Sequence, residues 1–248
     1  MLPEQWANPD YTKMSFKPSI KLTLMMFALA FVFIRLGLWQ TDRREEKILL
    51  FERFDNAPVM TLENALRDQE QFARVTASGR YDPERHILLD NRIYNGRAGV
   101  HVLTPFRLES GKHILVNRGW LPLAPDRRSQ HAVTTADGQR MISGVLNRPS
   151  EGGQRLGNPD IVKTDQWPQL VTYLELATVG EALGVSLEPW LLQLDAADDS
   201  GFEDRQWQAA VMEPKVHGAY ALQWFSLAAA ALVIWIILGV RRAGKPAA

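Results

Sequence analysis

The sequence contains no cysteine among its 248 residues. Disulfide bonds, thiolate metal sites, thiol redox chemistry and cysteine nucleophiles are therefore excluded. The same absence excludes a copper chaperone that works through a cysteine pair, although it does not exclude a histidine copper site. The chemistry of this protein must rest on other side chains.

The sequence also lacks the common catalytic motifs. It has no G-x-S-x-G, no P-loop and no G-x-G-x-x-G after a predicted strand. None of its five histidines forms an H-x-x-H or H-E-x-x-H pair. We expect His101 and His113 to meet across a hairpin, where a surface pair is favoured over a metal site. The sequence therefore predicts a protein that is not an enzyme.

The chain has no net charge, because 28 lysines and arginines balance 28 aspartates and glutamates. The charges are nevertheless segregated. Residues 41–218 carry 21 basic and 26 acidic side chains, whereas the two ends together carry 7 basic and 2 acidic ones. Since no basic patch is predicted in the acidic middle, nucleic acid is not an expected partner.

Two long apolar runs lie near the ends of the chain. The second run, residues 219–240, has 22 residues without a charge. As a helix it would be about 33 Å long, enough to cross a hydrocarbon core of roughly 30 Å. Trp224 and Trp235 lie toward opposite ends of it, as interfacial aromatic residues do. This run predicts a transmembrane helix.

The first run, residues 22–34, is 13 residues long and uncharged, and it continues past Arg35 to Trp39. A cleaved secretory signal would be followed by small residues, but residues 35–40 make a poor cleavage site. We therefore expect an uncleaved transmembrane helix over residues 20–40. Arg35 would extend its side chain to the outer headgroups, or alternatively face a partner or an acidic ligand.

Basic residues flank both runs on the side of the chain termini. They are Lys13, Lys17 and Lys21 before the first run, and Arg241, Arg242 and Lys245 after the second. Because basic flanks stay in the cytoplasm, residues 1–19 and 241–248 are predicted to be cytoplasmic and residues 41–218 to lie outside. The N-terminus does not resemble a mitochondrial transit peptide, so a bacterial inner membrane with a periplasmic central domain is expected.

The central region predicts an α+β domain, mainly antiparallel β with a few short helices, flanked by the two transmembrane helices. Residues 42–54 continue the first helix, and Thr61 is a plausible N-cap of a short helix. Strands are predicted at residues 74–81, 86–93, 99–106, 113–120, 141–147 and 190–195, with Asn95-Gly96 as a hairpin turn. Residues 151–169 predict a long loop, and residues 173–183 a helix that Gly184 ends.

His217 is set apart from the other histidines by its place, two residues before the second apolar run. At the outer membrane interface, an imidazole can ligate a haem iron. Basic residues nearby could pair with haem propionates, and aromatic residues could cover the macrocycle. From the residues alone, an amphipathic histidine that anchors the chain at the headgroups is favoured over a haem ligand. The residues of the haem hypothesis are His217, Arg43, Lys47, Trp39, Tyr220 and Trp224.

Several blocks, in order along nearly the whole chain, resemble the Surfeit locus protein 1 family. They are residues 36–40 with Arg43 and Lys47, then 90–92, Gly99, 103–105, 115–122, and His217 with residues 220–225. The resemblance implies a bacterial inner-membrane assembly factor for a haem–copper terminal oxidase, cytochrome c oxidase. It implies His217 as the candidate ligand of a haem a held transiently for delivery. Residues 211–216, just before this histidine, are ordinary in composition and do not strengthen that role.

The partners that the resemblance implies are the catalytic subunit of the oxidase, the lipid bilayer and haem A synthase. A quinol oxidase with haem–copper chemistry is an equally open client. The alternative function is a scaffold that stabilises oxidase subunits during assembly without binding haem.

The block Asn117-Arg118-Gly119-Trp120 ends a predicted strand, and Asn91-Arg92 ends the neighbouring one. Gly119 permits a turn that other residues disfavour, while Trp120 has a large apolar surface to bury. Two interpretations stay open for the pairs Asn91-Arg92 and Asn117-Arg118. Either they stabilise the sheet edge through contacts with each other, or they form a docking surface for the oxidase subunit. The residues of the docking hypothesis are Asn91, Arg92, Asn117, Arg118 and Trp120.

Overall fold

The computed structural model of the chain describes residues 16–123, 133–135, 137–149 and 166–243. The chain divides into two units. Unit 1 comprises residues 1–51 and 210–248, and unit 2 comprises residues 52–209. The two units are described separately below. Together they confirm the predicted α+β class, with an apolar helix near each end and a β-rich region with short helices between them.

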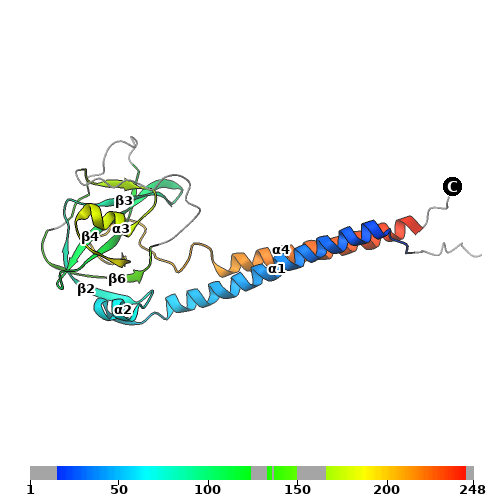
Figure 1. The fold of residues 1–248 in the computed structure, drawn as a ribbon, viewed down its shortest axis with the longest axis horizontal. Coiled ribbons are helices and arrows are strands. Elements are labelled where there is room, and N and C mark those ends of the chain that lie inside the picture. Colours follow the sequence, from blue (N-terminus) through cyan, green and yellow to red (C-terminus); the bar gives the residue numbers. More distant parts are fainter. Residues whose placement is uncertain (1–15, 124–132, 136, 150–165, 244–248) are drawn as a thin grey trace, which may run out of the picture. The chain divides into compact units, whose positions relative to one another are not determined.

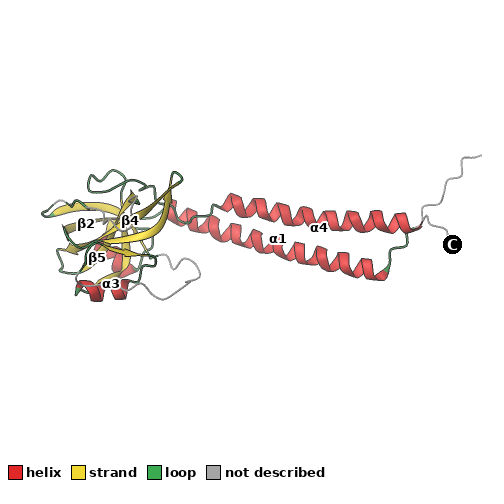
Figure 2. Cartoon of the chain, turned by 90° about the horizontal axis from the view of Figure 1, so that it is seen from above, coloured by secondary structure: helices red, strands yellow, loops and turns green. Residues whose placement is uncertain are grey.

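Unit 1 consists of two long helices, α1 (Ile20–Asp55) and α4 (Pro214–Ala243), which run antiparallel along each other (Figures 1 and 2). We call them the helix pair. Both are long and apolar enough to cross a membrane, which is compatible with a membrane protein. The predicted helical continuation through residue 54 is confirmed, because α1 continues without a break to Asp55.

Small residues form the contact between the two helices. The buried positions of the apolar stretches are Ala30, Gly37, Ala221, Ala228, Ala231 and Gly239. At Gly37 the approach is so close that a Cβ atom would lie 2.6 Å from the ring of Phe225. Helices in lipid gain little from the hydrophobic effect, so small residues that let the backbones approach provide most of the packing.

Unit 2 is built on one eight-stranded sheet. The strands are β1 (Val59–Thr61), β2 (Arg74–Tyr81), β3 (Ile87–Tyr94), β4 (Arg97–Leu108), β5 (His113–Pro122), β6 (Arg140–Asn147), β7 (Gln169–Val171) and β8 (Leu187–Leu194). Their order is β1-β2-β6-β8-β5-β4-β3-β7, and β2 also pairs with β4. This extra pairing closes β2, β6, β8, β5 and β4 into a ring, which we call the barrel.

Most neighbouring strands are antiparallel, as predicted, but three pairs are parallel. These are β1–β2, β3–β7 and β5–β8. Two short helices complete the unit: α2 (Leu62–Asp68) and α3 (Leu176–Leu183) (Figure 1). One apolar core joins the barrel strands to α2, with Phe106 and Ile114 fully buried. A second core joins α3 to the first residues of β3 and the middle of β4 and β5.

Several local predictions are confirmed. Asn95 and Gly96 form the turn between β3 and β4, with φ angles of 47° and 73°. Thr61 caps α2, because its side chain accepts a hydrogen bond from the backbone N–H of Asn64. Gly184 ends α3 in the left-handed conformation. The predicted loop at residues 151–169 falls largely outside the described residues, and its last residue, Gln169, begins β7.

The expectation that His101 and His113 meet across a hairpin is wrong. The two strands do pair, but the register places His101 opposite Trp120 and His113 opposite Arg107. The turn between β4 and β5 follows Leu108, so the two histidines lie at opposite ends of the ladder. In the described part of the chain, no group of three or more histidine, aspartate or glutamate side chains could hold a metal ion.

Candidate functional site

His217 lies in the first turn of α4, facing α1. Its Nδ1 atom is 2.8 Å from Oε1 of Gln40, a buried residue of α1. Because Oε1 can only accept, Nδ1 carries the proton and donates it to Gln40. The other ring nitrogen, Nε2, is buried and has no hydrogen-bond partner among the described residues.

This arrangement leaves His217 with the chemistry of a metal ligand. In neutral imidazole, the nitrogen without a proton keeps its lone pair, and the hydrogen bond to the other nitrogen fixes which one that is. A buried polar atom without a partner is uncommon, because its desolvation costs about 1–3 kcal/mol. Histidine nitrogen is an ordinary axial ligand of haem iron. His217 therefore fits the iron-binding part of a haem site.

Gln40 was not among the residues predicted for this site. It stands 177 positions from His217 in the sequence, so their contact depends on how the helices pack. The sequence did hold a signal: Gln40 is a polar residue at the end of an apolar run, and it shares a helix face with positions 44 and 47.

Three basic residues follow Gln40 within the next two turns of α1, and their contacts differ. Arg43 is exposed and donates to the Glu46 carboxylate at 2.7 Å. Arg44, which the sequence analysis did not select, lies beside His217: a Cβ atom on Gly218 would be 3.3 Å from its Cδ and 3.4 Å from its Nε. Neither Arg44 nor Lys47 has an ion-pair partner among the described residues. They are therefore better placed than Arg43 to meet an added anion.

The three predicted aromatic residues do not form one cage. Trp224 stacks on Phe33 of α1, with ring centroids 5.8 Å apart and an interplanar angle of 28°. Trp39 and Tyr220 remain 50% and 45% exposed. Trp224 thus belongs to the packing of the helix pair, whereas Trp39 and Tyr220 offer free aromatic surface on its outside.

The second predicted set, the docking residues, is largely interior. Asn117, Arg118 and Trp120 are 5%, 3% and 0% exposed. A docking surface made of these three side chains is therefore contradicted, since a partner would not reach them. They hold the sheet together instead, because β5 lies between β4 and β8 in the barrel and continues to Pro122 rather than ending at Gly119. Asn91 is exposed and Arg92 half-buried.

Arg118 is the centre of a buried polar network in unit 2. Its Nε donates to the carbonyl of Ser200 at 2.7 Å, and its Nη atoms donate to Oγ1 of Thr135 at 2.7 Å and to the carbonyl of Thr134 at 3.2 Å. The guanidinium also stacks over the ring of Tyr81 at 5.0 Å. Burial lowers its pKa.

The contacts of Gly119 and Trp120 explain why glycine and tryptophan occupy these two positions of the block 117–120. Gly119 has a φ of 105°, and a Cβ atom there would lie 2.4 Å from the carbonyl oxygen of Glu203. Glycine is therefore required, and the approach lets Trp120 form a bridge with Glu203. The indole of Trp120 donates to the carbonyl of Arg92 at 3.1 Å, so the two predicted pairs are in direct contact.

His101 lies in the same region and is kept neutral. It accepts a hydrogen bond from the Asn117 side chain at 3.2 Å. Burial, together with the charge of Arg92, lowers the pKa of His101 to about 4. Asp204 lies 3.9 Å from the other ring nitrogen, and burial raises the pKa of this aspartate. The pair is therefore structural at neutral pH, with an uncharged imidazole.

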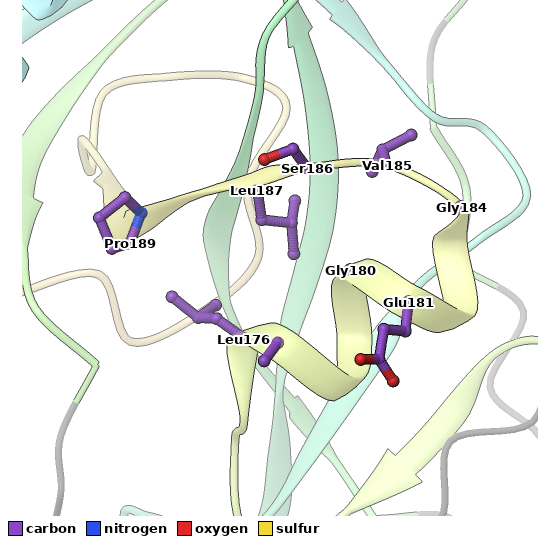
Figure 3. A pocket seen from close by; sticks show the side chains of 9 residues that line it. Leu176, Gly180, Glu181, Gly184, Val185, Ser186, Leu187 and Pro189 are labelled. Carbon is purple, nitrogen blue, oxygen red and sulfur yellow. The ribbon is translucent and has the colours of Figure 1, made fainter.

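A cavity of about 630 Å³ lies between α3 and the start of β8 (Figure 3). Leu176, Leu187 and Pro189 border it, and Glu181 is its one ionisable residue. An apolar hollow with a single carboxylate lacks the convergent polar groups of a specific ligand site. None of the predicted site residues lines it.

The fold and the His217 site together define a class of protein. In its chain, a long apolar helix precedes a β-barrel domain and another follows it, and a histidine of the second helix hydrogen-bonds to the first helix. A model of the SURF1 family matches residues 27–229. The chain therefore belongs to the SURF1 family. This finding confirms the resemblance seen in the sequence.

Similar proteins occur in bacteria and in eukaryotes. The chain is 28% identical over 230 residues to a SURF1-like protein of Rickettsia felis, covering 88% of this chain and 96% of that protein. It is 27% identical over 257 residues to a SURF1-like protein of Caenorhabditis elegans, covering 91% and 76%. Membership of the family implies an assembly factor for cytochrome c oxidase rather than an enzyme.

Proposed function

We propose that this protein assists the assembly of a haem–copper terminal oxidase by holding haem a at the helix pair for delivery to the catalytic subunit. The observation that carries this proposal is the buried, unpartnered Nε2 of His217, with Nδ1 engaged by Gln40. Bound haem a would supply the iron that a lone imidazole nitrogen ligates.

Different residues of the helix pair would hold different parts of the haem. Gln40 orients the imidazole and fixes its tautomer through the 2.8 Å hydrogen bond. Arg44 and Lys47, which follow Gln40 on the same face of α1, would attract the propionate carboxylates. Trp39 and Tyr220 would cover apolar surface from outside the pair. A single protein ligand suits transient holding rather than permanent storage.

The test is the visible spectrum of the full chain, purified in detergent from cells that make haem a. We expect a Soret band that His217→Ala abolishes and that Gln40→Ala weakens, with about tenfold lower haem affinity. Arg44→Gln should lower the retained haem, whereas Arg43→Gln serves as the matched control because Glu46 already engages that arginine. A Soret band unchanged in His217→Ala would remove this histidine as the ligand.

A second candidate function is a scaffold that holds oxidase subunits together without binding haem. The observation in its favour is that Nε2 of the half-buried His217 is itself covered by protein atoms. This function predicts co-purification with the oxidase that survives His217→Ala, and no haem at stoichiometric level. Haem content and oxidase recovery, measured on the same preparation, separate the two functions.

We propose further that both termini lie in the cytoplasm of a bacterium and that unit 2 is periplasmic. The support is the basic residues outside each apolar run, including Lys17, Lys21 and Arg241. Alkaline phosphatase fused near Gly152 should be active in this orientation. An inactive fusion at that site, with an active one at the C-terminus, would reverse the orientation.

A further inference from the structure

Two arginines and a histidine line up across adjacent strands of the barrel. Arg80 of β2 is the direct partner of Arg107 of β4, and Arg107 is in turn the partner of His113 of β5. Direct partners in neighbouring strands project from the same face of a sheet. The three side chains therefore form one row across β2, β4 and β5, the strands labelled in Figure 2.

This row is unfavourable on its own. Like charges placed directly opposite in a sheet destabilise the pairing. In the described part of the chain, neither Arg80 nor Arg107 has a carboxylate partner, and neither makes a side-chain hydrogen bond. Arg80 and Arg107 are one of only three residue pairs in the β2–β4 pairing that closes the barrel, so their repulsion acts on this pairing.

Arg85 brings a further guanidinium to the same place. Its Nε donates to the Asp82 carboxylate at 2.6 Å, and its Nη1 donates to the carbonyl of Leu183 at 2.9 Å. The backbone N–H groups of Glu84 and Arg85 donate to the same carboxylate. Asp82 is thus paired with Arg85 and offset by it, which leaves Arg80 and Arg107 without a carboxylate partner of their own among the described residues.

The row borders a cavity of about 250 Å³. One side of the cavity carries the guanidinium groups of Arg80, Arg85 and Arg107, with the uncharged imidazole of His113 beside them. The Asp82 carboxylate, which Arg85 pairs with, and Tyr81 also line the cavity, and its apolar wall is formed by Pro83, Pro105, Leu183 and Val185. The pKa of His113 is lowered by burial and by the charges of Arg107 and Arg85, against the opposing effect of Asp82. The local field is therefore positive, inside a region whose net charge is negative.

We propose that this cavity is a binding site for an oxyanion, the phosphate or carboxylate group of a small ligand. Guanidinium groups recognise such anions through paired, charge-assisted hydrogen bonds. A bound anion would turn the repulsion between Arg80 and Arg107 into a shared attraction. The apolar wall would accept the remainder of the ligand. The site lies in unit 2 and does not rest on the proposed function of the helix pair.

The test uses the full chain in an uncharged detergent, with inorganic phosphate and succinate as probes. Sodium chloride at equal ionic strength is the reference, because screening alone also weakens the arginine repulsion. We expect phosphate or succinate to raise the melting temperature by a few degrees beyond chloride. The preferred probe identifies the group, phosphate or carboxylate.

Arg80→Gln and Arg107→Gln should each weaken binding of the preferred probe about tenfold, measured by titration calorimetry. Arg74→Gln is the matched control. Arg74 is exposed, lies on the same strand and the same face as Arg80, and is opposite Val145 rather than a cation. Its substitution should leave binding unchanged.

A second measurement separates an anion site from a structural role. In chloride alone, Arg107→Gln should melt no lower than the wild type, because the substitution removes repulsion. Equal protection of all variants by phosphate, succinate and chloride would overturn the proposal. So would an Arg107→Gln variant that melts several degrees lower in chloride, since that result assigns the arginine to the fold.

Discussion

Unit 2 and the helix pair each contain a histidine with buried ring atoms, but the hydrogen bonding of the two imidazoles differs. In the barrel unit, His86 is 2% exposed and both ring nitrogens have partners, Oγ1 of Thr104 at 3.1 Å and the carbonyl of Pro83 at 3.2 Å. In the helix pair, His217 has one partner and one bare nitrogen. A satisfied imidazole serves the fold. An imidazole whose second nitrogen has no partner among the described residues is the observation on which the haem proposal rests.

The same contrast extends to arginine. Arg118 is buried and bonded through all three guanidinium nitrogens. Among the described residues of unit 2, two other buried nitrogens lack a partner, Nε of Arg92 and Nε of Arg140, but both are donors on guanidinium groups. Of these three nitrogens, only Nε2 of His217 presents a lone pair, which a metal ligand requires.

The largest effect should come from Arg118. Arg118→Met would leave the carbonyls of Ser200 and Thr134 without a donor and remove the stacking on Tyr81. We expect the free energy of unfolding of unit 2 to fall by about 3–4 kcal/mol. Denaturant unfolding of the full chain, followed by tryptophan fluorescence, measures it. Arg74→Met, an exposed arginine on β2, is the control and should change stability by about 0.5 kcal/mol or less. If Arg118→Met also changed stability by only about 0.5 kcal/mol, the hydrogen bonds of Arg118 would not stabilise unit 2, and the contrast with His217 would fail.

The next effect depends on pH. The pKa of His101 is about 4 in the folded chain, below its ordinary value of 6.5. The unfolded chain therefore binds the proton more readily, so stability is full above pH 6.5 and is lost as the pH falls toward 4. The expected loss is at most about 3 kcal/mol at the acid end. His101→Gln should reduce this acid sensitivity without removing it, because the pKa values of His86 and His113 are also lowered.

Melting temperatures between pH 4.5 and pH 8 measure this prediction. The two proteins should differ least at pH 8, where His101 is neutral whether folded or unfolded. Parallel curves for His101→Gln and wild type would mean that the imidazole is protonated in the folded chain near its ordinary pKa.

The smallest effect compares the buried His86 with the half-buried His217 directly. His86→Ala removes two hydrogen bonds inside unit 2 and should cost about 2 kcal/mol. His217→Ala removes one hydrogen bond and one unsatisfied atom, so its cost in protein made without haem should be about 1 kcal/mol or less. Calorimetric melting of the two variants decides the order. A larger loss for His217→Ala would place that histidine among the structural ones.

Local features of the fold were predictable from the sequence. The Asn95-Gly96 turn, the Thr61 cap and the Gly184 helix end each follow from a few neighbouring residues with strong backbone preferences. Closure of the barrel was not predictable in this way. It depends on the pairings β2–β4 and β5–β8, which join distant segments and carry no local signal.

The residues of the candidate site were likewise predictable where the signal is local and were missed where it depends on packing. His217 was identified because its type and its place before an apolar run are both visible in the sequence. Gln40 and Arg44 were missed because only the packing of the two helices shows which residues of α1 face His217. The docking hypothesis failed for Arg118 and Trp120 because arginine and tryptophan suit a surface and an interior network equally well. Their burial follows from the central place of β5 in the sheet.

The place of β8 in the barrel has a consequence for the order in which the protein can fold. The hairpins of β3, β4 and β5 join neighbouring segments and can form early, whereas β8 inserts between β5 and β6. The barrel therefore stays open until the ribosome has delivered Leu194, and α4 begins about 20 residues later. During synthesis, α1 is therefore made long before the barrel can close, whereas α4 is made soon after the last barrel strand.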